Sequence, residues 1–102
     1  MITMNDASTY NVPEYLLFKE EELKGTEYGG EIDFPNGYGL SIVKHQGSYG
    51  GTMGLYEIML TGADNEPVEY PEITYPNDTV QGYLTVENIN GIINKVAGLP
   101  QI

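Results

Sequence analysis

The sequence contains no cysteine, no arginine and no tryptophan, and it has a single histidine. Without cysteine, disulfides, thiolate catalysis and cysteine metal sites are all excluded. Small secreted domains usually need disulfides, so this absence favours an intracellular protein. No apolar run approaches the roughly 20 residues that a bilayer span requires. The N-terminal stretch MITMNDASTY has neither the basic nor the apolar region of a signal peptide. We therefore expect a protein without membrane contact.

Positive charge is scarce as well. Fifteen Asp and Glu residues face four lysines, which gives a net charge of −11. Because Lys and Arg supply the phosphate contacts of nucleic-acid-binding proteins, this composition argues against direct nucleic-acid binding. The acids fall mainly in residues 1–36 and 62–87, each with a net charge of −6, on either side of a neutral centre at 37–61. Such a charge steers a protein toward partners with a basic surface.

The acidic N-terminal segment contains one candidate helix, over residues 12–24 (VPEYLLFKEEELK). Asn11 can cap its start, Pro13 suits the first turn, and Gly25 can end it. Residues 15–19 (YLLFK) suit a short strand equally well, and the pattern alone leaves both readings open.

The centre of the chain predicts an antiparallel sheet of about four strands. GEIDF, at 30–34, alternates apolar and acidic residues, which is typical of a half-buried strand. Asn36 and Gly37 both tolerate positive φ, so they predict a tight hairpin into a second strand, YGLSIVKH. LYEIML reads as a central third strand, and residues 68–70 (VEY) extend again.

The C-terminal segment predicts a helix that packs one face on the sheet. Thr85 suits the N-cap, Glu87 the first turn, and Gly98 a left-handed residue after the last turn. The apolar residues recur at helical spacing: Val86, Ile89, Ile92, Ile93 and Val96.

These elements predict an α+β fold in one domain over residues 1–102, with 40% hydrophobic residues to form its core. We assign the acidic N-terminal segment and its candidate helix to 1–30, the sheet to 31–84 and the C-terminal helix to 85–98.

Catalytic and metal-binding patterns are weak. His45 lies four residues after Ser41. Four residues of a strand span about 13 Å, which is too far for a hydrogen bond between these two side chains. Asp64, Asn65 and Glu66 could offer oxygen ligands, but the calcium-loop pattern is absent and these residues are good turn formers. The glycine-rich stretches lack the spacing and the lysine of phosphate-binding loops, so their glycines serve turns. We expect no enzyme activity, no cofactor and no bound metal.

Tyrosine is the most distinctive apolar residue of the chain. Seven of the nine tyrosines lie between residues 28 and 83, and each can contribute to the core or to a contact surface. Tyr49, in the glycine loop SYGG, is the one that we expect to be exposed.

Several motifs carry a family resemblance. They are FPNGYGLSIV at 34–43, SYGG at 48–51 and GLYE at 54–57, followed by Ile73, Thr74, Asp78, Gly82, Leu84 and Thr85. Over residues 31–96 the chain resembles an uncharacterised family of small proteins of tailed bacteriophages. The resemblance implies a phage origin, and so the cytoplasm of an infected bacterium, and it supplies no active-site residue.

Acidity and this resemblance together predict a non-enzymatic accessory protein that binds and inhibits a host protein. A more specific hypothesis is that the protein is an anti-defence factor, of the anti-restriction or anti-CRISPR kind, whose carboxylates imitate nucleic-acid phosphates. The residues expected to contact the partner are Glu20, Glu21, Glu22, Glu27, Glu31, Asp33, Asp64, Glu66, Glu69, Glu72 and Tyr49. The alternative is a structural or assembly protein that makes a homo-oligomer or a virion contact through its Gly/Tyr-rich sheet region.

Overall fold

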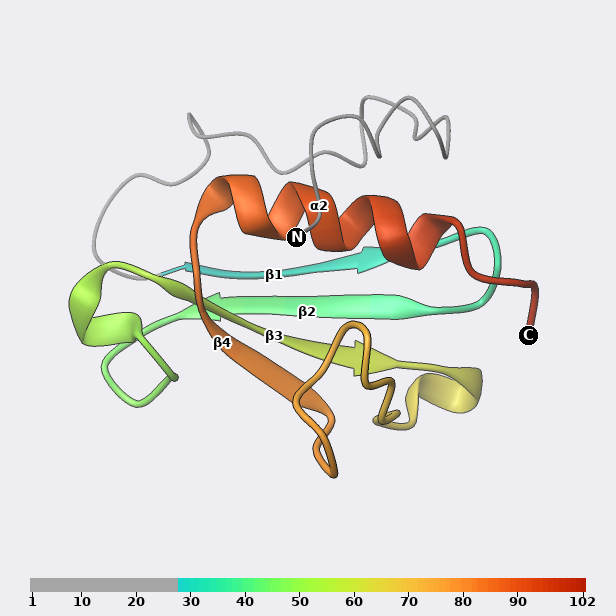
Figure 1. Ribbon diagram of the computed structural model, residues 1–102, viewed down its shortest axis with the longest axis horizontal. Coiled ribbons are helices and arrows are strands. Elements are labelled where there is room, and N and C mark those ends of the chain that lie inside the picture. The colour runs from blue at the N-terminus through green and yellow to red at the C-terminus, as the bar shows by residue number, and fades with distance from the viewer. Residues whose placement is uncertain (1–27) are drawn as a thin grey trace.

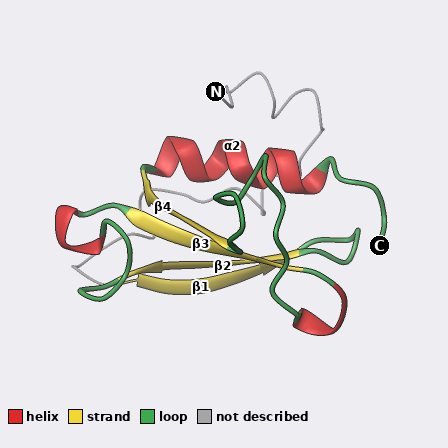
Figure 2. Ribbon diagram, turned by 60° about the horizontal axis from the view of Figure 1, so that its bottom comes forward, coloured by secondary structure: helices red, strands yellow, loops and turns green. Residues whose placement is uncertain are grey.

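The protein has an α+β fold, as the sequence predicts, in a computed structural model that describes residues 28–102 (Figure 1). One four-stranded antiparallel sheet has its strands in sequence order. These strands are β1 (Tyr28–Asp33), β2 (Gly39–Lys44), β3 (Tyr56–Thr61) and β4 (Val80–Leu84). Helix α2 (Val86–Ala97) lies over one face of the sheet, and the opposite face carries no described α-helix (Figure 2). The candidate helix at 12–24 and its strand alternative lie outside the described residues.

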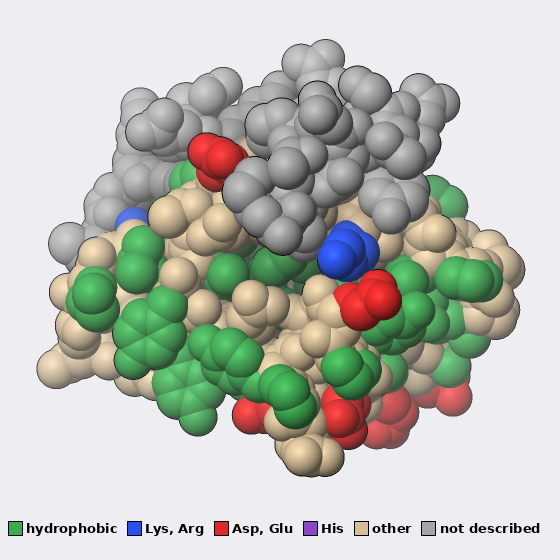
Figure 3. Space-filling view, viewed as in Figure 1, with side chains coloured by type: hydrophobic (Ala, Val, Ile, Leu, Met, Phe, Trp, Pro, Cys, Tyr) green, Lys and Arg blue, Asp and Glu red, His purple; other side chains and the backbone are tan. Residues whose placement is uncertain are grey.

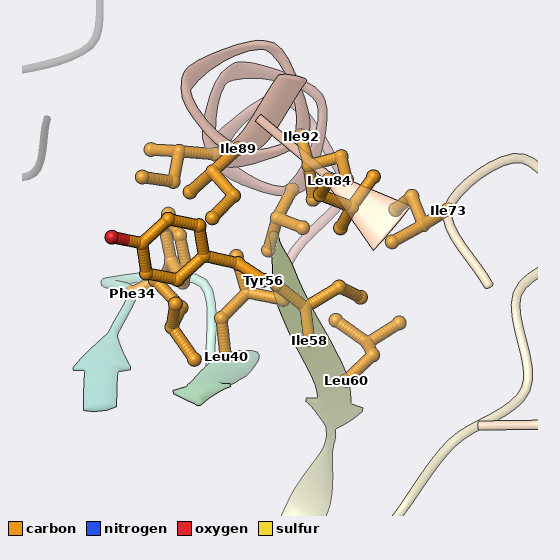
Figure 4. Packing of buried hydrophobic residues seen from close by; sticks show 12 residues of the cluster. Phe34, Leu40, Tyr56, Ile58, Leu60, Ile73, Leu84, Ile89 and Ile92 are labelled. Atoms are coloured by element: carbon orange, nitrogen blue, oxygen red, sulfur yellow. The ribbon is translucent and has the colours of Figure 1, made fainter. Parts of the chain in front are cut away.

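The core lies between the sheet and α2, and it is formed by the apolar residues that recur at every second position of the strands and at helical spacing in α2. Alternate residues of β2 and β3 face the helix, so Leu40, Ile42, Ile58 and Leu60 are almost fully buried. Figure 4 shows the buried side chains of the sheet beneath those of α2, with the ring of Tyr56 among them. The helix contributes Ile89, Ile92, Ile93 and Val96, the apolar set that its spacing predicts.

Helix α2 begins as predicted and ends differently. The Thr85 hydroxyl accepts a hydrogen bond from the Asn88 amide, and the Asn88 side-chain oxygen accepts one from the Thr85 amide, both 3.1 Å long. The prediction of a left-handed Gly98 is wrong, because this residue has φ −86° and ψ −2°. Its amide donates to the Asn94 carbonyl at 3.1 Å, so the chain continues its right-handed path past the last turn.

The β1–β2 connection is a hairpin, as predicted, but only one of its two candidate turn residues adopts a positive φ. The Gly37 amide donates to the Phe34 carbonyl at 3.0 Å, and the Phe34 amide donates to the Tyr38 carbonyl at 2.8 Å. Only Gly37 has a positive φ, of 97°, while Asn36 does not. Pro35 suits the first central position of this turn, and the left-handed glycine completes a longer loop with a bulge.

Asn36 joins this hairpin to the end of the helix. Its side-chain amide nitrogen donates to the carbonyls of Val96, at 2.8 Å, and Leu99, at 3.1 Å. Its side-chain oxygen accepts from the Tyr38 amide at 3.2 Å, and its backbone carbonyl accepts from the Ile102 amide at 2.9 Å. Asn36 therefore ties the hairpin to the backbone at the end of α2, where the Val96 carbonyl also accepts from the Leu99 amide at 3.1 Å.

The fourth strand lies at Val80–Leu84, so the prediction of a strand at 68–70 is wrong. The earlier segment pairs with β3 only through an isolated bridge between Thr61 and Pro67. It then turns away, because the amides of Ile73 and Thr74 both donate to the Tyr70 carbonyl at 2.7 Å.

The outer edge of β4 is covered by one tyrosine. The Tyr75 amide donates to the Val80 carbonyl at 2.9 Å. The Tyr75 hydroxyl accepts from the Gly82 amide at 3.1 Å and donates to the Gly82 carbonyl at 3.3 Å. An exposed strand edge is a template for unwanted pairing, and Tyr75 blocks that pairing along this strand.

Candidate protein-binding surface

The loop between β2 and β3, residues 45–55, is fixed by its own contacts. The Ser48 hydroxyl accepts from the His45 amide at 2.9 Å and donates to the His45 carbonyl at 2.8 Å. A Cβ atom on Gly51 would lie 1.8 Å from the His45 carbonyl oxygen, so only glycine fits there. The glycines of this loop therefore serve its close turns, as predicted.

The same loop docks on β4. The Tyr49 carbonyl accepts from the Tyr83 amide at 3.1 Å, and the Tyr49 amide donates to a carboxylate oxygen of Glu57 at 2.8 Å. A Cβ atom on Gly82 would lie 2.3 Å from the Cβ atom of Tyr49. Glycine at 82 thus allows the loop and the strand to meet backbone against backbone.

Tyr83 occupies a backbone conformation that tyrosine rarely adopts. Its φ is +59°, and the β3–β4 register is irregular between Tyr56 and Ile58, opposite this residue. A non-glycine residue in the left-handed region costs on the order of 1 kcal/mol, which the surrounding structure has to supply. Its side chain is 55% exposed, so this conformation places an aromatic ring at the surface.

Three exposed tyrosines lie around Gly82, and we call them the tyrosine surface: Tyr49, Tyr75 and Tyr83, with exposed fractions of 50%, 36% and 55%. Figure 3 shows hydrophobic side chains gathered over the loop after β2 and over β4. The predicted exposure of Tyr49 is confirmed. Sequence reasoning missed that Tyr75 and Tyr83 join it, since their meeting depends on the contact at Gly82.

The other described tyrosines belong to the core or pack against it. Tyr56 is buried, and Tyr28, Tyr38 and Tyr70 are partly buried beside the core cluster. The rings of Tyr28 and Tyr56 meet edge to face at 6.2 Å between centroids, and the Lys44 ammonium lies 4.8 Å from the Tyr56 centroid. Lys44 is only 8% exposed, so one of the few positive charges is largely withdrawn from the surface.

A groove adjoins the tyrosine surface, between β4 and α2. It has a volume of about 400 Å³, and Gln81 and Tyr83 of β4 line it together with Asn88, Ile92 and Lys95 of α2. Glu72, from the segment before β4, lies at the same groove. The helix residues are spaced on one face of α2, but the sequence could not show that this face meets β4.

The predicted acidic contact residues fall into two groups. Glu31 and Asp33 are exposed on β1, and Asp64 and Glu66 are exposed in the turn after β3. Asn65 of that turn lines a common hollow with Glu31 and Asp33, so these acids share one end of the sheet.

The second group lies in the segment before β4. Glu69 and Glu72 are both exposed, and a Glu69 carboxylate oxygen accepts from the Asn77 amide at 2.8 Å. Figure 3 shows acidic side chains along the side of the molecule formed by the β3–β4 connection. The remaining predicted acids lie outside the described residues: Glu20, Glu21, Glu22 and Glu27.

The residues weighed for chemistry have local structural roles. Asp64 and Asn65 have φ values of 57° and 59°, and the Gly62 amide donates to the Glu66 carbonyl at 2.8 Å, which confirms the predicted turn. His45 is exposed, and its ring Nδ1 accepts from the Gly47 amide at 3.1 Å. Within residues 28–102, no three His, Asp or Glu side chains are placed to hold a metal ion.

Comparison with known proteins gives no relative. No protein-family model matches the chain, and neither a curated protein nor a solved structure matches it. Across the described residues, no helix combines the length and apolarity needed to cross a membrane. A functional proposal therefore rests on the tyrosine surface, the groove beside it and the exposed acids.

Proposed function

We propose that this chain is a non-enzymatic phage accessory protein that binds and inhibits a host protein in the cytoplasm of the infected bacterium. The observation that carries the proposal is the tyrosine surface: Tyr49, Tyr75 and Tyr83 are exposed together on a backbone fixed by hydrogen bonds and close glycine contacts. Exposed tyrosines on a fixed backbone are typical of surfaces that contact other proteins.

The chemistry of this surface suits a protein partner. Tyrosine offers a large contact area, a polar tip and few rotatable bonds, and it is enriched among residues that dominate interface energies. Because the supporting loop is already fixed, little conformational entropy is lost on binding. The groove between β4 and α2 provides a recess beside the rings into which a side chain of the partner can insert.

The charge distribution supports a partner with a basic surface. The chain carries a net charge of −11, and all six predicted acids that the structure describes are exposed. In the sharper form of the proposal these carboxylates imitate nucleic-acid phosphates and occupy the basic groove of a defence protein. The resemblance to tailed-phage proteins supports this form. Binding should then weaken steeply with rising salt, because screening removes long-range attraction.

Affinity capture from a host lysate tests the proposal. The full chain is compared with the double variant Tyr49→Ser and Tyr83→Asn, in which asparagine tolerates the left-handed backbone at 83. We expect one nucleic-acid-binding host protein to be retained at low salt and largely lost with the double variant. Gln46→Ala, an exposed change in the same loop, serves as the control.

Two results would contradict the proposal. Equal capture by the double variant would show that the tyrosine surface does not bind the host protein. Undiminished capture at 1 M salt would contradict the hypothesis that the carboxylates imitate nucleic-acid phosphates.

The alternative function is assembly, as a homo-oligomer or in a virion. Met53, at 67% exposure, lies in the same loop as Tyr49 and enlarges the apolar area of the neutral Gly/Tyr region. Analytical ultracentrifugation separates the two functions. Self-association that Tyr83→Asn abolishes would favour assembly, whereas a monomer at high micromolar concentration would exclude self-assembly through this surface.

A further inference from the structure

Strand β1 is an edge strand of the sheet, and no strand within residues 28–102 lies on its outer side. Its pairing with β2 begins at Phe34, whose amide donates to the Tyr38 carbonyl, and the register then pairs Ile32 with Leu40. In an antiparallel ladder, hydrogen-bonded and non-hydrogen-bonded pairs alternate, so every second residue directs its amide and carbonyl away from the partner strand. These residues of β1 are Gly29, Glu31 and Asp33, and each is exposed.

The hydrogen bonds of the described residues leave this edge open. Within residues 28–102, no backbone bond outside the β1–β2 ladder involves Gly29, Glu31 or Asp33. Strand β4 differs, because the Val80 carbonyl and both the amide and the carbonyl of Gly82 are bonded to Tyr75. An extended segment could therefore add to the sheet beside β1, with backbone hydrogen bonds supplying much of the affinity.

The side chains beside this edge define the chemistry of such a segment. Glu31 and Asp33 lie on the face of the sheet opposite α2, because their neighbour Ile32 packs against the core. They border a hollow of about 230 Å³, which the register places across β1, β2 and β3. Its other lining residues are Ile32, Gly39, Leu40, Ser41, Met59, Thr61 and Asn65.

This hollow suits a cationic side chain. Two carboxylates stand at its rim, and Ser41 and Thr61 add hydroxyl oxygens that can accept hydrogen bonds. Met59 gives apolar surface for the methylene stem of lysine or arginine, which such residues bury while the charged group stays hydrated. Among residues 28–102, no lysine or histidine lines the hollow, so no described side chain there repels a cation.

We propose that β1 is a docking strand for an extended segment of a partner protein that carries Lys or Arg at alternate positions. The alternate side chains of the added strand lie over the face opposite α2, where Glu31 and Asp33 receive the cationic groups. A second copy of this chain is the poorer occupant, because its own β1 acids would stand opposite these acids. This inference rests on the proposed function and specifies how the basic partner is recognised.

A peptide-binding measurement on the full chain tests the inference. The probe is a short, terminally blocked peptide that alternates arginine with threonine, and its Kd is measured by fluorescence anisotropy. Glu31→Gln with Asp33→Asn should weaken binding about tenfold, because two partly exposed charge pairs are lost. The matched control, Asp78→Asn with Glu87→Gln, removes the same charge at positions away from β1, keeps an oxygen that can accept from the Thr79 amide, and should leave the Kd nearly unchanged.

A second peptide separates strand addition from simple charge attraction. Methyl groups on alternate backbone nitrogens leave its charge intact but block hydrogen bonds to the edge, so its binding should be largely lost. In the complex with the unmethylated peptide, the amides of Gly29, Glu31 and Asp33 should exchange with solvent more slowly. Equal binding of both peptides, or equal weakening by both pairs of substitutions, would overturn the inference.

The outcome distinguishes this inference from the proposed function. If the host protein is captured through the tyrosine surface but the peptide fails to bind, the docking strand is wrong and the function stands. If the peptide binds at β1 but no host protein is captured, the docking strand stands and the inhibitor function fails.

Discussion

Replacing Asn36 with alanine should be among the most destabilising polar substitutions in the described chain. Asn36 is 8% exposed, and its side chain makes three hydrogen bonds: with the Val96 carbonyl at 2.8 Å, the Leu99 carbonyl at 3.1 Å and the Tyr38 amide at 3.2 Å. Each such bond contributes roughly 0.5–1.5 kcal/mol net, and a buried group left unsatisfied costs more. We therefore expect Asn36→Ala to lower the free energy of unfolding by about 2–4 kcal/mol.

Urea unfolding followed by circular dichroism measures this loss. For a domain of this size, the loss corresponds to a fall in Tm on the order of 10–20 °C. Gln46→Ala, at an exposed loop position, should change the free energy by less than about 0.5 kcal/mol. A loss below about 0.5 kcal/mol for Asn36→Ala would refute the reasoning that this side chain joins the hairpin to the helix.

The variant Asn36→Asp adds a test by pH. It keeps the oxygen that accepts from the Tyr38 amide, but at neutral pH it places a carboxylate against the carbonyls of Val96 and Leu99. That repulsion should raise the pKa of the introduced carboxyl in the folded state above its unfolded value. The stability deficit relative to the parent should then be largest at pH 7 and shrink as the pH falls through the raised pKa. A deficit that does not depend on pH would contradict this account.

Two further predictions concern backbone features. Gly51→Ala should cost several kcal/mol in urea unfolding, because its Cβ atom would lie 1.8 Å from the His45 carbonyl oxygen. Gly29→Ala is its control, since nothing lies within 4 Å of the added atom, and equal losses would contradict the steric argument. Thr85→Ala should lose about 1 kcal/mol by removing the cap that bonds the Asn88 amide, whereas Thr85→Ser should retain most of it. Thermal melts should rank the two Thr85 variants in that order, and indistinguishable melts would exclude a role for the hydroxyl.

The sequence predicts the elements that local chemistry determines. The α2 helix follows from its cap at Thr85 and its apolar spacing, and β2 and β3 follow from their alternating residues. The sequence does not predict strand β4, because apolar and polar residues alternate poorly in VQGYL. The side chain of Gln81 donates a hydrogen bond to the Ile73 carbonyl, and Gly82 has no side chain to mark a face of the strand. The irregular register at Tyr83 further obscures the strand pattern.

The candidate sites depend on contacts between segments that are distant in the sequence. The exposure of Tyr49 could be predicted from its glycine neighbours. Its position beside Tyr83 could not, because it depends on the close approach of the loop to β4 that Gly82 permits. Asn36 was read as a turn residue, because no local pattern shows that a helix ends beside it. The grouping of Glu31 with the turn at Asn65 likewise comes from the sheet register and not from spacing along the chain.

The covering of β4 by Tyr75 has a consequence for higher-order assembly. Because Tyr75 occupies the Val80 carbonyl and both backbone groups of Gly82, the sheet of residues 28–102 can be extended only beside β1. A protein with two open edges can polymerise into fibres, since each added molecule presents a new edge. Here the β4 side is closed, so any growth of the sheet beyond β1 depends on the outer edge of the added strand and not on this protein.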